Sequence, residues 1–156
     1  MNESDVKSRV VEYFKEEGYH TLKEFELDCV SKMLRANVIA FKWLNEYDLE
    51  AIAVECKGDT NIHGLVDTIY FQLREYQAGF PITYLAVPEN TIKKEKVPKD
   101  LLESYGIGLL AVGREVKEEV QLKSEKSAPK LDFNTYGYGV RQKLVAYMTL
   151  QEITKK

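Results

Sequence analysis

The sequence predicts an α/β protein with a mixed central sheet flanked by helices. Its amphipathic and apolar segments follow one another as one helix, three strands, and then helices and strands in alternation. The chain has 156 residues, which is enough for one domain with a short appendage and a sizeable core. Its 44% hydrophobic and 30% charged fractions are those of an ordinary globular protein, and they exclude a disordered or collagen-like chain.

The first segment, residues 3–17, has the spacing of an amphipathic helix. Val6, Val10 and Phe14 recur every four residues and define its apolar face. Glu3 lies about one heptad before Val10, so we expect its carboxylate near the inward face.

Five segments have the composition of β-strands. They are residues 21–30, 36–41, 49–56, 82–87 and 106–112. The first three should form a meander, with the first turn at residues 31–33, and the later strands should run parallel because helices separate them. The third is almost entirely apolar, as expected of a strand buried on both faces.

Helices are predicted at residues 62–79 and 99–105, with a lysine-rich segment at 91–99 between them. The inner stripe of the longer helix consists of Leu65, Ile69, Leu73 and Tyr76. Together these segments form a core domain at residues 1–113.

Residues 114–156 form a C-terminal extension of a polar strand, a loop and an amphipathic helix at 138–153. The apolar side of this helix consists of Val140, Leu144, Val145 and Met148. Packing on the core is the first interpretation of this side, and a homodimer seam is the second.

The rare residue types exclude several kinds of site. Cys29 and Cys56 lie far apart in apolar runs, which excludes a disulfide framework or a cysteine zinc site and indicates free thiols. With only His20 and His63, any divalent metal would be held mainly by oxygen atoms. No apolar run approaches a membrane span and no secretory signal is visible, so we expect a cytoplasmic protein without a membrane partner.

The most distinctive motif is Val54-Glu55-Cys56-Lys57-Gly58, at the end of the buried third strand. Side chains alternate along a strand, so Glu55 and Lys57 point to the same face. Charged groups among apolar neighbours are costly to desolvate and need partners or a purpose. The spacing alone favours an ordinary surface ion pair, since strand ends are wet and short patterns are common by chance.

Other polar residues are predicted to lie near this strand end. Asn37 lies in the preceding strand, Glu3 on the first helix, and Gln72 and Tyr76 one helical turn apart on the core-facing helix. Taken singly, Gln72 and Tyr76 are explained by hydrogen bonds to loop carbonyls, and Glu3 by contact with solvent. Together they favour one polar cleft at the end of the third strand.

Over residues 3–112 the chain resembles the PD-(D/E)xK nuclease superfamily, which includes restriction endonucleases, archaeal Holliday-junction resolvases, and Mrr-like and RecB-like nucleases. The resemblance rests on the inward Glu3, the strand at 35–41, the strand end at 54–58, and Gln72-x-x-x-Tyr76. The last element is most similar to the RecB-like branch. The resemblance implies a restriction-endonuclease-like αβββαβ core, here followed by the C-terminal helical extension.

The resemblance also implies a metal-dependent endonuclease that hydrolyses DNA phosphodiester bonds in repair, recombination or defence. The metal, Mg²⁺ or Mn²⁺, would be held by Glu3, Asn37, Glu55 and the backbone carbonyl of Cys56. The catalytic residues implied are Glu55, Lys57, Asn37, Gln72 and Tyr76. Lys57 would stabilise the attacking hydroxide, while Gln72 and Tyr76 would orient the phosphate or Lys57. A homodimer is also implied, because family members that cut two strands are often dimers.

The chain departs from the family at Asn37, where the family carries a metal-binding aspartate. An asparagine offers a carbonyl oxygen but removes one negative charge. Candidates for a migrated carboxylate are Glu26, Asp28 and Asp48. One alternative function is therefore a catalytically impaired nuclease-fold protein that binds nucleic acid or acts as a scaffold. Another is a plain α/β domain in which Glu55 and Lys57 form a surface pair.

Basic residues supply the phosphate contacts that a DNA-binding protein needs. The candidates are Lys32, Arg35, Lys93, Lys94 and Lys96. The alternative is that they are solvated loop residues. The net charge of −3 argues mildly against a general nucleic-acid coat protein, but it permits the acidic cleft and lysine rim that a metal-dependent nuclease needs. The partner that the resemblance implies is DNA, with branched or otherwise structured DNA among the candidates.

Overall fold

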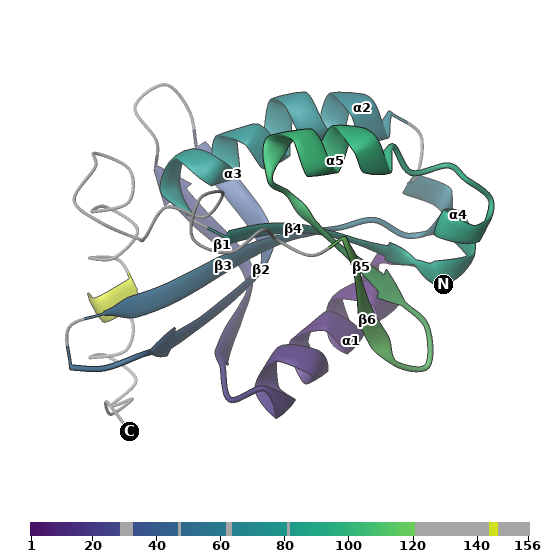
Figure 1. Ribbon diagram of the computed structural model, residues 1–156. Helices are drawn as coiled ribbons and strands as arrows, with labels where there is room; N and C mark the ends of the chain where they lie inside the picture. Colours follow the sequence, from purple (N-terminus) through teal and green to yellow (C-terminus); the bar gives the residue numbers. More distant parts are fainter. Residues whose placement is uncertain (29–32, 47, 62–63, 81, 121–143, 147–156) are drawn as a thin grey trace.

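Six strands form one mixed sheet in the computed structural model, in the order β1-β2-β3-β4-β5-β6 (Figure 1). Their bounds are β1 His20–Asp28, β2 Met33–Trp43, β3 Leu49–Cys56, β4 Ile82–Pro88, β5 Gly108–Val112 and β6 Val116–Val120. β1, β2 and β3 form an antiparallel meander, β3, β4 and β5 run parallel, and β6 returns antiparallel to β5. The mixed α/β class and the change from meander to parallel strands are confirmed. The structure describes residues 1–28, 33–46, 48–61, 64–80, 82–120 and 144–146.

The helices differ from the prediction in two places. Their bounds are α1 Glu3–Glu16, α2 Leu65–Thr68, α3 Arg74–Gly79, α4 Glu89–Lys93 and α5 Lys99–Tyr105, with a 3₁₀ turn at Asp59–Asn61. The predicted helix at 62–79 contains a π-helical turn, Ile69–Leu73, between α2 and α3. α4 was predicted only as a lysine-rich segment.

The two faces of the sheet are covered by different helices. α1 lies on one face, whereas α2, α3 and α5 lie on the other (Figure 1). β3 is central to both layers, because Ala51 and Ala53 pack on the α2–α3 side, and Ile52 and Val54 pack on the α1 side. The prediction that this strand is buried on both faces is confirmed.

The C-terminal extension is described only in part. β6 belongs to the central sheet, and Leu144 is fully buried in the core on the α2–α3 side. The predicted loop at 124–137 and most of the helix at 138–153, with Val140 and Met148, lie outside the described residues, as do Cys29, Lys32 and His63. Within the described part of the chain, no helix is long and apolar enough to cross a membrane.

A close backbone contact brings the start of α1 to the end of β3. A Cβ atom on Gly58 would lie 2.4 Å from the amide nitrogen of Glu3 and 2.6 Å from the carbonyl carbon of Asn2. The first turn of α1 is held by a capping box between Asn2 and Asp5, in which the Asp5 amide donates to Asn2 Oδ1 at 2.8 Å. Glu3 is therefore placed beside the strand end that carries Glu55.

This contact predicts that Gly58→Ala lowers the free energy of unfolding by about 1–3 kcal/mol, because rigid backbone must move to admit the methyl group. Urea denaturation measures the loss. Gly113→Ala is the matched control, since the nearest group there is the flexible carboxylate of Glu89. Equal losses in both variants would contradict the close-contact account.

Candidate functional site

Among the residues whose burial the structure describes, Glu55 is the buried acidic residue, with only 4% of its surface exposed. It lies next to the end of β3, on the same face as Ala53, where α3 covers the sheet. The Tyr76 hydroxyl of α3 donates to Glu55 Oε2 at 2.9 Å and also lies 2.6 Å from the carbonyl oxygen of Arg35. Its single hydrogen cannot fully satisfy both acceptors. A protonated Glu55 donating to Tyr76 relieves this shortage.

Burial raises the pKa of Glu55 to about 7. The carboxylates of Glu3 and Glu24 raise this pKa further, whereas the hydrogen bond from Tyr76 and the charge of Lys57 lower it. Glu55 therefore changes its charge near neutral pH, and it does so under the influence of two other acidic side chains.

Lys57 lies on the same side as Glu55, as its spacing predicts. Its Nζ is 3.7 Å from Glu55 Oε1, and its backbone N–H donates to the carbonyl oxygen of Ala86 in β4 at 3.0 Å. The side chains of Lys57 and Glu55 are 18% and 5% exposed, so this pair is largely removed from solvent. It differs in this respect from an ordinary surface ion pair.

Asn37 connects three strands of the sheet. The β2–β3 register, in which Val38 faces Val54, puts Asn37 next to Glu55, and the β1–β2 register puts Glu24 opposite Asn37. Asn37 Oδ1 accepts a hydrogen bond from the Cys56 N–H at 2.7 Å, while Nδ2 donates to Glu24 Oε1 at 3.4 Å. An ionised aspartate at this position would lack the donor that faces Glu24.

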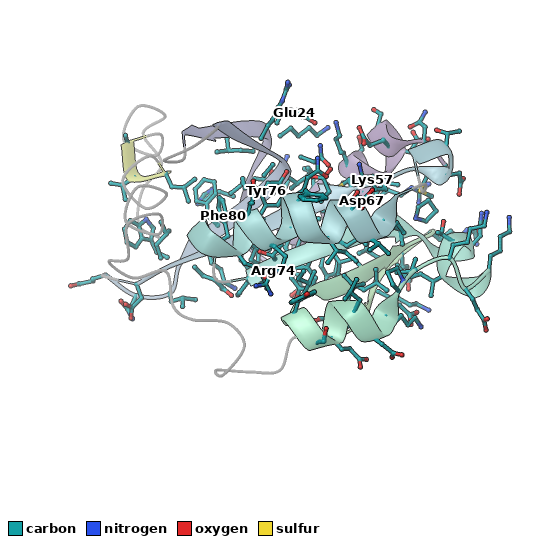
Figure 2. All side chains as sticks on the ribbon, turned by 90° about the horizontal axis from the view of Figure 1, so that it is seen from above. Glu24, Lys57, Asp67, Arg74, Tyr76 and Phe80 are labelled. Atoms are coloured by element: carbon teal, nitrogen blue, oxygen red, sulfur yellow. The ribbon has the colours of Figure 1, made fainter. Side chains whose placement is uncertain are left out.

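Glu24 is the site residue that the sequence reasoning missed. Its carboxylate forms an ion pair and hydrogen bond with Lys7 of α1, and its Oε2 lies 2.9 Å from Arg35 Nε. Burial alone raises the pKa of Glu24, but Lys7, Asn37 and Arg35 together outweigh burial and hold that pKa below its usual value. Lys7 Nζ also lies 3.5 Å from Glu3 Oε2. Figure 2 shows Glu24, Lys57 and Tyr76 on one side of the α2–α3 helix, with Arg74 on the other.

The predicted residues thus divide into two groups. Glu3, Asn37, Glu55, Lys57 and Tyr76 surround the end of β3, together with the backbone of Cys56. Gln72 lies in the π turn, and its side chain is exposed. Within the described part of the chain, no hydrogen bond connects Gln72 to the residues at the end of β3. The side chain of Cys56 faces the α1 layer, where burial raises the pKa of its thiol.

The structure describes the side chain of one of the three candidates for a migrated carboxylate, Asp48. Asp48 precedes β3, at the end of the strand opposite Glu55, and its Oδ2 accepts from Asn45 Nδ2 at 2.7 Å. Asp48 is therefore wrong as a migrated ligand. The side chains of Glu26 and Asp28 are not described, although both residues belong to β1.

The basic candidates lie around the same edge of the sheet. Because β3 and β4 are parallel, their carboxyl ends lie side by side, and α4 follows β4 directly. Lys93, Lys94 and Lys96 are exposed in α4 and just after it. Arg35 is exposed on β2 and bound to Glu24.

The donor set fits a hard divalent cation. Its atoms are carboxylate and carbonyl oxygens, and the mutual repulsion of Glu3, Glu24 and Glu55 favours a bound positive charge. Among the described residues, there is no group of three acidic, histidine or cysteine side chains placed to hold a metal ion together. Mg²⁺ needs none, because it usually keeps several waters and binds one or two carboxylates together with a substrate phosphate.

Comparison with known proteins identifies a similar fold. No family model and no curated protein matches the chain. Among solved structures, the chain is similar to the SPO1766 protein of unknown function from Silicibacter pomeroyi, with a TM-score of 0.61 and 18% sequence identity. The likeness covers 97% of this chain and 89% of that protein, so nearly the whole fold is shared.

The raised pKa of Glu55 predicts a pH-dependent stability. Below about pH 4.5 the carboxyl is protonated in both the folded and unfolded states, and stability is lost as the pH rises from there through 7, since only the folded state resists ionisation. The difference in free energy of unfolding between Glu55→Gln and the natural chain should therefore shift in favour of the variant by on the order of 2–3 kcal/mol from pH 5 to pH 8. Urea denaturation at the two pH values measures this, with Glu103→Gln as an exposed control. A difference that does not change with pH would contradict the assignment.

Proposed function

We propose that this protein is a metal-dependent endonuclease of restriction-endonuclease-like fold that hydrolyses DNA phosphodiester bonds. The observation that supports this best is the buried Glu55 carboxyl at the end of β3, with the Lys57 ammonium 3.7 Å away and the Tyr76 hydroxyl hydrogen-bonded to it. A buried, mutually oriented carboxylate and ammonium in a polar cluster is typical of a catalytic site.

Mg²⁺ or Mn²⁺ would be held by Glu55 with oxygens of Glu3, Asn37 and the Cys56 backbone. When bound, the ion would supply Lewis acidity toward a phosphodiester oxygen and a lowered pKa for a bound water. Lys57 stabilises the negative charge that develops on the attacking oxygen and the phosphate, because β3 fixes it beside Glu55. Tyr76 positions the Glu55 carboxyl, and the exposed Gln72 contacts a phosphate of the bound substrate.

DNA would approach the edge of the sheet where β3 and β4 end. Lys93, Lys94 and Lys96 contribute exposed positive charges beside this edge, and Arg35 contributes another from β2. Contacts of this kind supply most of the affinity for DNA without reading its sequence. A homodimer, which would present two such sites to two strands, stays a prediction.

A second candidate function is nucleic-acid binding without catalysis. The observation that favours it is the charge balance of the site, in which three carboxylates are paired with three basic side chains and no metal ion is needed to neutralise them. The carboxylates are those of Glu3, Glu24 and Glu55, and the basic side chains are those of Lys7, Lys57 and Arg35. The side-chain amide of Asn37 also has a partner for each of its two polar atoms: its oxygen accepts from the Cys56 N–H, and its nitrogen donates to Glu24. This function keeps the lysine contacts and needs no divalent cation.

The catalytic proposal predicts that Lys57→Met reduces cleavage at least 100-fold, since its charge acts on the developing negative charge, while DNA affinity changes less than threefold. Plasmid and four-way-junction substrates in Mg²⁺ and in Mn²⁺ measure cleavage. Lys15→Met, on the exposed part of α1, should leave the rate unchanged. No cleavage by the natural chain with either metal would reject the endonuclease and leave the second candidate.

The predicted DNA edge is tested separately, with equilibrium binding across a series of salt concentrations. The variant Lys93→Ala/Lys94→Ala should lose affinity for all sequences alike and lower the slope of log K against log salt by about 2, one for each lost phosphate contact. The control Lys15→Ala/Lys117→Ala removes the same charge from exposed positions on α1 and β6. An equal loss in both variants would mean that only total charge matters.

A further inference from the structure

Lys7 occupies the space between two of the carboxylates of this site. Its Nζ hydrogen-bonds to Glu24 Oε1 and lies 3.5 Å from Glu3 Oε2, and only 18% of its side chain is exposed. Burial lowers the pKa of Lys7, but Glu24 and Glu3 outweigh burial and hold it above its usual value. The group is therefore a permanent ammonium ion bound by carboxylate oxygens.

Glu24 is held in place by more than this ion pair. Its φ of +53° lies in the left-handed region, which a non-glycine residue adopts only where its surroundings hold it. Arg35 Nε contacts one carboxylate oxygen at 2.9 Å, and Asn37 Nδ2 lies 3.4 Å from the other. The Cys56 N–H can only donate, so it requires Asn37 Oδ1 to face β3 and the Asn37 NH₂ group to face Glu24.

Glu24 also shares an electrostatic environment with Glu55. Its charge and that of Glu3 both raise the pKa of Glu55, so the three carboxyls repel one another. Lys7 relieves this repulsion for Glu3 and Glu24, from a helix whose first turn is fixed against Gly58. A divalent cation at the end of β3 would compete with Lys7 for the same oxygens.

We propose that Glu24 is a further carboxylate of the divalent-cation site, beside Glu55 and Glu3, and that Lys7 is the internal counter-cation, which the divalent ion displaces. Asn37 is the positioning residue, because its amide links the Glu24 carboxylate to the backbone of Cys56 beside Glu55. The inference rests on the proposed function, since it concerns the same site. In the metal-free protein, Lys7 then balances the charge of the carboxylates. Because a divalent ion must displace Lys7, this side chain lowers the affinity of the site for metal.

Isothermal titration with MnCl₂ at low ionic strength, without DNA, tests this inference on the full chain. Lys7→Met should bind Mn²⁺ at least tenfold more tightly than the natural chain, and Glu24→Gln at least tenfold more weakly. The controls are Lys15→Met and Glu16→Gln, which make the same changes on exposed positions of α1 and should leave affinity unchanged. Circular dichroism establishes that each variant is folded, and Lys7→Gln replaces Lys7→Met where the methionine variant is not.

The outcomes separate this inference from the proposed function. If the natural chain binds Mn²⁺ and the Lys7 and Glu24 variants bind it equally well, the inference is overturned and the endonuclease stands. If only the Lys7 variant binds Mn²⁺, the counter-cation role is supported and the metal-dependent function of the natural chain fails. If neither the natural chain nor the Lys7 variant binds Mn²⁺, both the inference and the proposed metal-dependent function are overturned.

Discussion

Keeping a carboxyl group inside the sheet at the end of β3 is the main physical constraint on this protein. Glu55 is 4% exposed, and burial raises its pKa to about 7, so the folded chain resists its ionisation. Tyr76, Lys57 and the row of polar groups across β1 and β2 are arranged around this group. A chain selected only for stability would place an apolar side chain there, because the desolvation penalty of a buried charge often exceeds the electrostatic energy that its partners supply.

The surrounding charges show how this cost is offset. Glu3 and Glu24 share Lys7, Glu24 also binds Arg35, and Glu55 binds Lys57, so each carboxylate has a cation within 4 Å. The elements that carry them come together because α1 packs against the backbone of Gly58 and because β3 and β4 end at one edge. The fold therefore brings three carboxylates and three basic side chains together at the end of β3, and the proposed metal-dependent function concerns this cluster.

Most of the fold was predictable from the sequence, because apolar runs and helix caps are local signals. β3 and α5 have their predicted bounds, and Glu55 and Lys57 were found because side chains alternate along a strand. Glu24 was missed because pairing across a hairpin depends on where the turn lies. A turn at 31–33 would pair Asn37 with Leu27, whereas the observed register puts Glu24 opposite Asn37. The π turn at Ile69–Leu73, which holds the exposed Gln72, has no comparable sequence signal.

We propose above that a divalent cation binds at the end of β3 through Glu55, and the endonuclease function depends on this binding. The most direct measurement is an anomalous difference map from a crystal of the natural chain soaked in MnCl₂. We predict one strong peak within about 2.5 Å of a Glu55 carboxylate oxygen, with Lys7 turned away from Glu24. A fully occupied manganese site elsewhere, or a Glu55 still bonded only to Tyr76 and Lys57 at saturating Mn²⁺, would contradict the claim.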